Sequence, residues 1–158
     1  MKDRANSFYK TAESFYKFVD SLEKCNSDSV YEDLLKKLLS VYREGLYLPQ
    51  VDFDTDIKYP KSRKILCPKI DIMKYDTYWE VFNSYHFEQP IQGSLVDDIK
   101  NIYIELKKGE YYYQRQQFSE AIWQWKFGFE THWGLHAIEA IRALHSLVYI
   151  ELYLKDEM

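Results

Sequence analysis

The chain contains few of the residues that form tight turns, with only 5 glycines and 4 prolines among 158 residues. A sandwich or barrel of many short strands needs frequent turn residues, so this composition disfavours an all-β fold. The hydrophobic fraction of 46% and the charged fraction of 29% exclude a disordered chain. At this length we expect one domain covering residues 1–158. These observations favour a single helical domain.

Cysteine is also scarce, with Cys25 and Cys67 alone in the sequence. Their separation matches no zinc-binding spacing, so we expect two inert free thiols in a reducing compartment. The amino terminus lacks the apolar core of a secretory signal. No uncharged apolar run reaches the length of about 18 residues that a membrane-spanning helix needs. The sequence therefore predicts a cytoplasmic protein without membrane contact.

Positive charge is limited as well. The chain has 21 lysines and arginines against 25 aspartates and glutamates, which gives a net charge of -4. Binding to a phosphate backbone requires clustered basic side chains. The one basic run, from Lys58 to Lys69, is typical of a solvated loop. We therefore expect no nucleic-acid partner.

Hydrophobic residues recur at steps of three and four along most of the chain, which predicts helices. Polar N-caps and prolines set the limits of these helices. The predicted helices cover about residues 7–24, 29–48, 76–85, 94–115 and 119–153. In the short helix 76–85, Trp79 and Phe82 are predicted to face inward. Residues 51–74 show no helical period, which predicts a long irregular loop.

The segment Ser119–Tyr153 holds three of the four tryptophans and three of the four histidines. On a helix, this segment is apolar on two neighbouring faces, which predicts that other helices cover most of its sides. A bend is predicted near Gly128 or Gly134. The fold class is therefore all-α, a bundle of about five helices around a central, buried C-terminal helix.

The helix that precedes this segment begins at Ser94. Asp97 follows three residues later, as in a capping box, and both Asp97 and Asp98 suit the positive end of the helix dipole. Gly109 and Trp125 match positions of a single tetratricopeptide hairpin, and the pattern is not repeated at the same period. We therefore expect an antiparallel pair of helices and no solenoid.

His132 and His136 lie one helical turn apart, so their imidazoles can approach one point. Two histidines are half of a metal site, and Glu139, Glu105 or an aspartate of the Ser94 helix could complete it. Two histidines on an apolar face are more often hydrogen-bonded core residues. We therefore expect no cofactor, with a divalent metal held by His132, His136 and Asp98 as the minority alternative.

The rise of 1.5 Å per residue places Asp98 at the same level as these histidines on the neighbouring helix. We therefore predict contact between Asp98, or its neighbour Asp97, and one histidine. Glu130 lies about 200° around the helix from His132, on the second apolar face. There its carboxylate needs a partner such as Arg142 or a tyrosine hydroxyl.

Two strings of residues are specific enough to indicate a family. The string W-x-W-x-F-x-F-E-x-H-W-G-x-H-A spans Trp123 to Ala137, and G-S-L-x-D-D-I-x-x-I-Y spans Gly93 to Tyr103. Together they resemble the signature of a bacterial family of helical proteins, the domain of unknown function DUF5063. The resemblance is strong over the carboxy-terminal half and looser over the first two helices. It implies an all-helical cytosolic bacterial protein and no particular activity.

The same resemblance selects seven residues as a binding site or a buried polar network. They are Asp97, Asp98, Trp125, Glu130, His132, Trp133 and His136.

The sequence contains no serine–histidine–aspartate arrangement, no phosphate-binding glycine loop and no dinucleotide fingerprint. Aromatic residues make up 18% of the chain, including 15 tyrosines, and aromatic residues are enriched at protein interfaces. We therefore predict a non-catalytic protein-binding module whose partner is another protein. The alternative is a metal-dependent or acid/base helical enzyme centred on His132 and His136. An open cleft lined by both histidines would favour the enzyme, whereas a closed core would favour the binding module.

Overall fold

The computed structural model describes residues 1–24, 27–52, 60, 63–70 and 74–158. About 69% of these residues are helical, which confirms the predicted all-α class. Three long helices are separate elements: α1 (Lys2–Ser21), α2 (Ser29–Leu46) and α3 (Leu95–Tyr113). A short 3-10 turn, Leu22–Lys24, extends α1.

The fourth long helix is built from five consecutive segments. They are α4 (Phe118–Gly128), a π-helical turn (Phe129–Trp133), α5 (Gly134–Ser146), a second π-helical turn (Leu147–Glu151) and α6 (Leu152–Asp156). The first π turn lies where the sequence predicts a bend. Gly134 is required there because a side chain at this position would collide with the carbonyl oxygen of Phe129.

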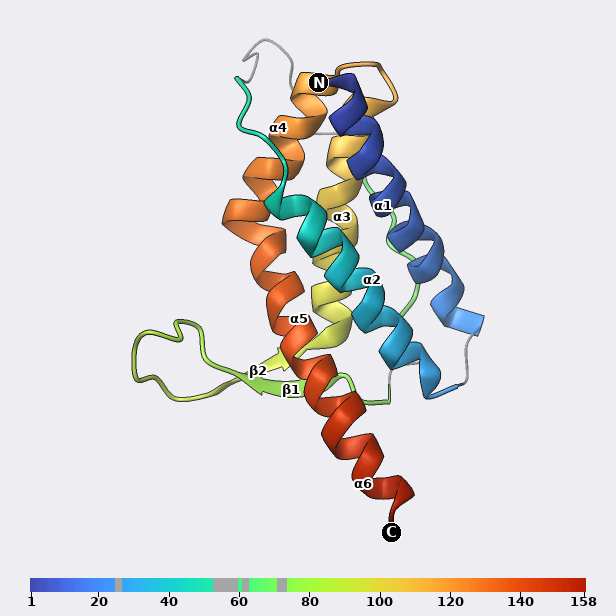
Figure 1. The fold of residues 1–158 in the computed structure, drawn as a ribbon, viewed down its shortest axis with the longest axis vertical. Coiled ribbons are helices and arrows are strands. Elements are labelled where there is room, and N and C mark those ends of the chain that lie inside the picture. The colour runs from blue at the N-terminus through green and yellow to red at the C-terminus, as the bar shows by residue number, and fades with distance from the viewer. Residues whose placement is uncertain (25–26, 53–59, 61–62, 71–73) are drawn as a thin grey trace.

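The four long helices surround one hydrophobic core. Helix α1 packs against α2 and α3, α2 packs against α5, and α3 packs against α4 and α5. In Figure 1, α1 and the C-terminal helix run downwards while α2 and α3 run upwards, so the chain between α2 and α3 returns along the whole bundle. The α1 stripe of Phe8, Ala12, Phe15 and Val19 is fully buried, as its three- and four-residue spacing predicts.

The predicted helix over residues 76–85 is wrong. The structure has a two-stranded antiparallel sheet instead, in which β1 (Thr77–Glu80) pairs with β2 (Ile91–Ser94). Tyr78 lies opposite Gly93, and its ring occupies the space that a side chain at Gly93 would need. Residues 77–80 form a strand because residues 91–94, which follow the turn, pair with them. This pairing outweighs a weak local preference for helix.

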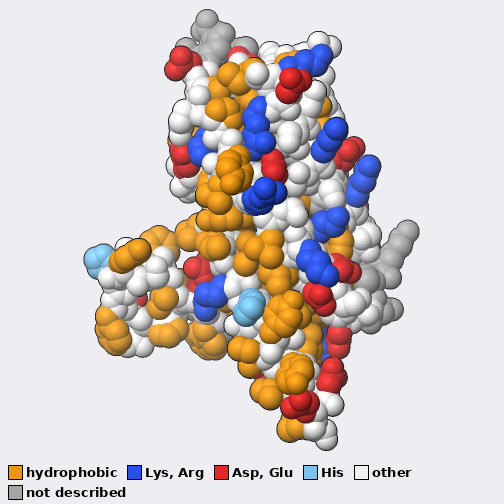
Figure 2. All heavy atoms as spheres, in the orientation of Figure 1, with side chains coloured by type: hydrophobic (Ala, Val, Ile, Leu, Met, Phe, Trp, Pro, Cys, Tyr) orange, Lys and Arg blue, Asp and Glu red, His pale blue; other side chains and the backbone are white. Residues whose placement is uncertain are grey.

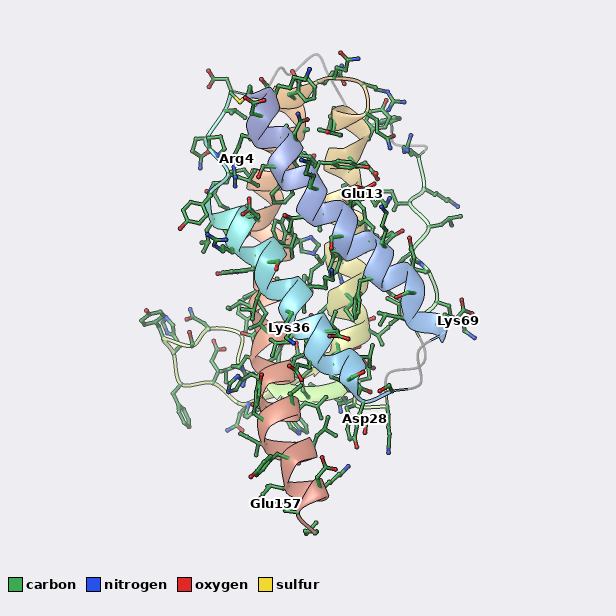
Figure 3. All side chains as sticks on the ribbon, turned by 45° about the vertical axis from the view of Figure 1, so that its right-hand side comes forward. Arg4, Glu13, Asp28, Lys36, Lys69 and Glu157 are labelled. Atoms are coloured by element: carbon green, nitrogen blue, oxygen red, sulfur yellow. The ribbon has the colours of Figure 1, made fainter. Side chains whose placement is uncertain are left out.

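The orientation predicted for this segment is also wrong. Trp79 and Phe82 are exposed by 64% and 73%, so neither faces inward. The hairpin of residues 77–94 begins beside α5 in the lower part of the bundle, and the loop between its strands projects sideways in Figure 1 and still stands clear of the helices after the 45° turn of Figure 3.

The C-terminal helix is central on one side only. Trp125 and Trp133 on its inner side are fully buried, whereas Phe127, Leu135 and Ile138 are exposed by 40% or more. Three other long helices can cover the inner side of a fourth but not its outer side, so the prediction that most sides are covered is wrong. Beyond the bundle, α6 continues alone to the lower end of the molecule (Figure 1).

The remaining described residues carry little regular structure. Residues 51–52, 60, 63–70 and 74, which belong to the predicted irregular loop, form no helix or strand, and the rest of that loop lies outside the described residues. Cys67 is a free thiol, whereas Cys25 is not described. Within the described part of the chain, no helix combines the length and apolar composition needed to cross a membrane.

Candidate functional site

The hydrogen bond predicted between an aspartate of the Ser94 helix and a histidine is present. Ser94 caps α3 by accepting from the backbone N–H of Asp97, which places Asp98 in the first turn. Antiparallel packing sets this turn beside α5, and Asp98 Oδ1 lies 2.8 Å from His136 Nδ1. Asp98 is only 6% exposed, so the carboxylate side of this contact between the two helices is buried.

Tyr78 is a third member of this group that sequence reasoning missed. Its hydroxyl donates to Asp98 Oδ2 at 2.6 Å, so each carboxylate oxygen of Asp98 has its own partner. Burial and the hydrogen bond to Asp98 raise the pKa of Tyr78 well above its ordinary value. The phenol therefore stays a donor. Thr77, Tyr78 and Trp79 are residue types that favour strands, and Gly93 follows later in the chain. This combination is the signal that could have indicated a hairpin here.

A second carboxylate–histidine pair lies two turns further along α3. His132 Nδ1 is 3.5 Å from Glu105 Oε1, and Glu105 is 8% exposed. Lys108 also donates to Glu105. The rings of His132 and His136 are 4.9 Å apart between centroids and nearly perpendicular. His132, in the π turn, thus points one nitrogen towards Glu105 of α3, and His136, in α5, points one towards Asp98.

These groups border an open cleft of about 340 Å³ between the hairpin and α5. This volume lies within the range of small-molecule sites, roughly 300–1,000 Å³. The hairpin contributes three residues, α3 contributes Asp98, and the C-terminal helix contributes the remainder. The lining residues are Glu80, Val81, Phe82, Asp98, Thr131, His132, Leu135, His136 and Glu139. Both predicted histidines therefore reach solvent through one cleft.

The base of the hairpin is fixed by further polar contacts. Arg142 of α5 donates to the backbone carbonyl of Trp79 at 2.8 Å and pairs with Glu139 at 3.3 Å. Asp76 accepts from the Ser94 hydroxyl at 2.9 Å and from the backbone N–H of Val96 at 2.8 Å. Because these bonds join the strands to α3 and α5, the cleft has two walls that are held in place.

The two motif tryptophans belong to the core. Trp125 donates from its ring nitrogen to the carbonyl of Leu106, and Trp133 donates to the carbonyl of Trp125, each at 2.9 Å. Both side chains are fully buried, so they form part of a buried polar network and do not line the cleft. Gly109 lies against the Trp125 ring, as the predicted close-packed hairpin requires.

The other two acidic motif residues lie at the surface. Asp97 is exposed and does not line the cleft. Glu130 is exposed too, and it accepts from Gln50 at 2.8 Å and lies 3.4 Å from Lys126. The expectation that Glu130 is buried beside Arg142 or a tyrosine is therefore wrong. The π turn alters the helical register at this point, so faces drawn on a straight α-helix do not apply.

Within the part of the chain that the structure describes, His132, His136 and Asp98 are not grouped as three ligands of one metal ion. Asp98 engages Nδ1 of His136, which is the role of a carboxylate that orients a histidine and not that of a third ligand. Among the described residues, no group of three or more histidine, cysteine, aspartate or glutamate side chains is placed to hold a metal ion. No described residue hydrogen-bonds to Nε2 of His136, so this nitrogen can bond to a ligand in the cleft.

Comparison with known proteins supports the fold and the family. The crystal structure of protein BF1032 from Bacteroides fragilis is similar, with a TM-score of 0.70 over 90% of each chain and 18% sequence identity. At this identity the similarity shows the fold alone. No curated protein matches the chain. The model of a family described as "Domain of unknown function (DUF5063)" matches residues 1–150. The chain therefore belongs to the DUF5063 family, as the two strings around its aspartates and histidines predict.

Proposed function

We propose that this protein is a non-catalytic protein-binding module of the bacterial cytoplasm, and that its hairpin is the main contact with the partner. The proposal depends on one observation above all. Four aromatic side chains of the projecting hairpin are exposed: Trp79 by 64%, Phe82 by 73%, Tyr85 by 96% and Phe87 by 100%. We call these four residues the hairpin aromatics. Apolar groups gathered on an exposed element are typical of an interaction surface, and aromatic residues are enriched at interfaces.

A second apolar surface lies next to the hairpin. Tyr149, Ile150, Tyr153 and Leu154 repeat at four-residue steps on the last part of the C-terminal helix, and each is exposed by 49% or more. In Figure 2, hydrophobic side chains gather both on the hairpin and along the lower C-terminal helix. A partner that contacts both elements would bury a larger area than either element offers alone.

The anchoring of the hairpin supports binding without rearrangement. The hydrogen bonds from Tyr78 to Asp98 and from Arg142 to Trp79 join β1 to α3 and α5. A surface that is already ordered loses less conformational entropy on binding. The hairpin aromatics are therefore presented on a base that is held to the bundle.

The charge of the hairpin favours a protein partner over a nucleic acid or an anionic membrane. The segment from Glu80 to Ile91 carries Glu80 and Glu88 and has no lysine or arginine. Phosphate backbones and anionic lipid surfaces both attract basic side chains. A folded protein with an apolar surface next to basic residues is complementary to this hairpin.

Affinity capture with matched variants tests the proposal. The hairpin variant replaces Tyr85 and Phe87 by serine, and the control variant replaces Leu46 and Tyr47 by serine at the exposed end of α2. We expect the wild type and the control to capture the same partner from the native cell, and the hairpin variant to lose it. Equal capture by both variants would exclude the hairpin as the binding surface.

Acid/base catalysis is a second candidate function, because the cleft that both histidines line is open, which is the arrangement expected of the enzyme and not of a binding module with a closed core. Asp98 holds Nδ1 of His136, which is how a carboxylate orients a catalytic imidazole. Turnover of a chromogenic ester by the purified protein, lost in His136→Ala and kept in the hairpin variant, would support catalysis. Equal rates in the wild type and His136→Ala would exclude this role for the dyad.

A further inference from the structure

We propose that the cleft between the hairpin and α5 binds the side chain of an arginine from the protein partner. This inference rests on the proposed binding function and specifies the chemistry of the contact. The cleft has a volume of about 340 Å³ and begins where β1 ends, so it opens beside the hairpin aromatics. Phe82 belongs to both surfaces, because it lines the cleft and is 73% exposed.

Most of the surface that lines the cleft is apolar, and hydrogen-bond acceptors lie at a few positions in it. Three carboxylates line it, from Glu80, Asp98 and Glu139, and no lysine or arginine does so among the described residues. The hydroxyl of Thr131 donates to the backbone carbonyl of Phe127 at 2.7 Å. Both oxygens of Asp98 are already bonded to Tyr78 and His136, so Glu80 and Glu139 supply the carboxylates for a ligand group.

His136 adds a ring whose orientation is fixed by a hydrogen bond. His136 uses Nδ1 for Asp98, at 2.8 Å, and no described residue hydrogen-bonds to its Nε2. Because Asp98 engages Nδ1, the ring nitrogen left for a ligand is Nε2, on the other side of the ring. His132 Nδ1 lies 3.5 Å from Glu105 Oε1 without a hydrogen bond between them, so this ring is held less firmly. The cleft thus offers Nε2 of an oriented histidine, His136, in addition to its carboxylates.

A guanidinium group matches this lining better than other side-chain groups. It has five N–H donors and no acceptor, in a planar fork that suits carboxylates. Its flat face packs on aromatic rings, and its methylene stem packs on apolar walls. Phe82 provides such a ring at the rim, and Val81 and Leu135 provide apolar walls.

The position of the cleft indicates that the arginine belongs to a protein. Arginine is enriched among the residues that contribute most to protein–protein binding, together with tryptophan and tyrosine. The hairpin aromatics would bury apolar area against the partner, and the cleft beside them would receive one arginine. Together they form one continuous surface. Arg142 lies outside the lining and pairs with Glu139 at 3.3 Å, so it lowers the negative charge of the cleft only in part.

Titration of the full chain with capped amino acids tests the inference without a known partner. The probes are N-acetyl-arginine amide, its lysine counterpart and its citrulline counterpart, which has the shape of arginine but no charge. We expect the arginine probe to shift backbone amide resonances of residues 80–82 and 131–139. The citrulline probe should bind about tenfold more weakly or less, because it cannot form charge-assisted hydrogen bonds.

Variants locate the bound probe. Glu80→Gln and Glu139→Gln should each weaken arginine binding about two- to fivefold, as expected for a partly exposed ion pair. Glu32→Gln removes the same charge from α2, outside the cleft, and should leave the affinity unchanged.

Four results would overturn the inference. They are no binding of the arginine probe, equal binding of the arginine and citrulline probes, equal binding of the arginine and lysine probes, and resonance shifts outside the cleft. These results are distinct from a failure of the proposed function. If the arginine probe does not bind while the hairpin variant still loses the partner, the binding function stands and the arginine pocket is wrong.

Discussion

At the scale of single residues, Asp98 joins three elements of the fold. Its two carboxylate oxygens bind the Tyr78 hydroxyl of β1 and the His136 ring of α5, while its backbone belongs to α3. A buried carboxylate costs stability unless its hydrogen bonds are made, so removing either partner affects the whole junction. The attachment of the hairpin to the bundle can therefore be tested at one hydroxyl group.

Tyr78→Phe should lower the free energy of unfolding by about 1–2 kcal/mol, because Asp98 loses a buried donor. Urea unfolding measures this change. Tyr85→Phe removes the same hydroxyl from a side chain that is 96% exposed, and it should change stability by less than about 0.5 kcal/mol. Equal effects of the two substitutions would show that the Tyr78–Asp98 bond does not stabilise the fold.

The effect of Tyr78 should depend on pH in the alkaline range. The pKa of Tyr78 in the folded protein is raised above the ordinary value of 10.0, so the folded state holds this proton more tightly than the unfolded state. The contribution of Tyr78 to the free energy of unfolding is fully present below pH 10 and is lost as the pH rises towards the raised pKa of the folded state. The stability difference between the wild type and Tyr78→Phe should therefore shrink above pH 10, whereas a constant difference would contradict the raised pKa.

The sequence predicts part of this group of residues and misses the rest for a definite reason. Asp98 and His136 can be paired because helical rise and antiparallel packing depend only on the spacing of residues within two helices. Tyr78 cannot be added in this way, because its position depends on pairing with a strand more than ten residues later. Glu130 is misplaced because a π turn changes the helical register, which a hydrophobic pattern on an ideal helix does not show.

At the scale of elements, the packing of α3 against α4 depends on a close approach. A side chain at Gly109 would overlap the ring of Trp125, which is fully buried and donates to the Leu106 carbonyl. Glycine at this position therefore brings the two helices together. The partial hairpin pattern in the sequence predicts this contact because a small residue and a tryptophan must occur at a fixed separation to meet.

Gly109→Ala should destabilise the protein by about 1–3 kcal/mol, the usual cost of overpacking a core, although alanine favours an isolated helix. Thermal and urea unfolding give the change. In a Trp125→Leu background the same substitution should cost less, because the ring that it displaces is absent. An equal loss of stability in both backgrounds would mean that the Trp125 ring is not what requires a glycine at position 109.

At the scale of the whole molecule, the positions of the helices and the buried core residues can be predicted from the sequence more readily than the exposed apolar surface. The buried stripe of α1 and the limits of α2 and α3 are close to those that periodicity and caps predict. The open side of the C-terminal helix is not predictable in this way, because an apolar side chain has the same identity whether a neighbour covers it or not. The exposed aromatic surface appears only once the hairpin and the helices are placed together.

Site-specific photo-crosslinking in the native cell tests the central claim most directly. A photoreactive amino acid at position 87 places the probe on the hairpin, and the same amino acid at position 47 places it on an exposed aromatic position of α2. We expect a discrete crosslinked protein from position 87, and loss of that product when Tyr85 is also replaced by serine. No such product should form from position 47. The same products from both positions, or none from position 87, would contradict binding through the hairpin.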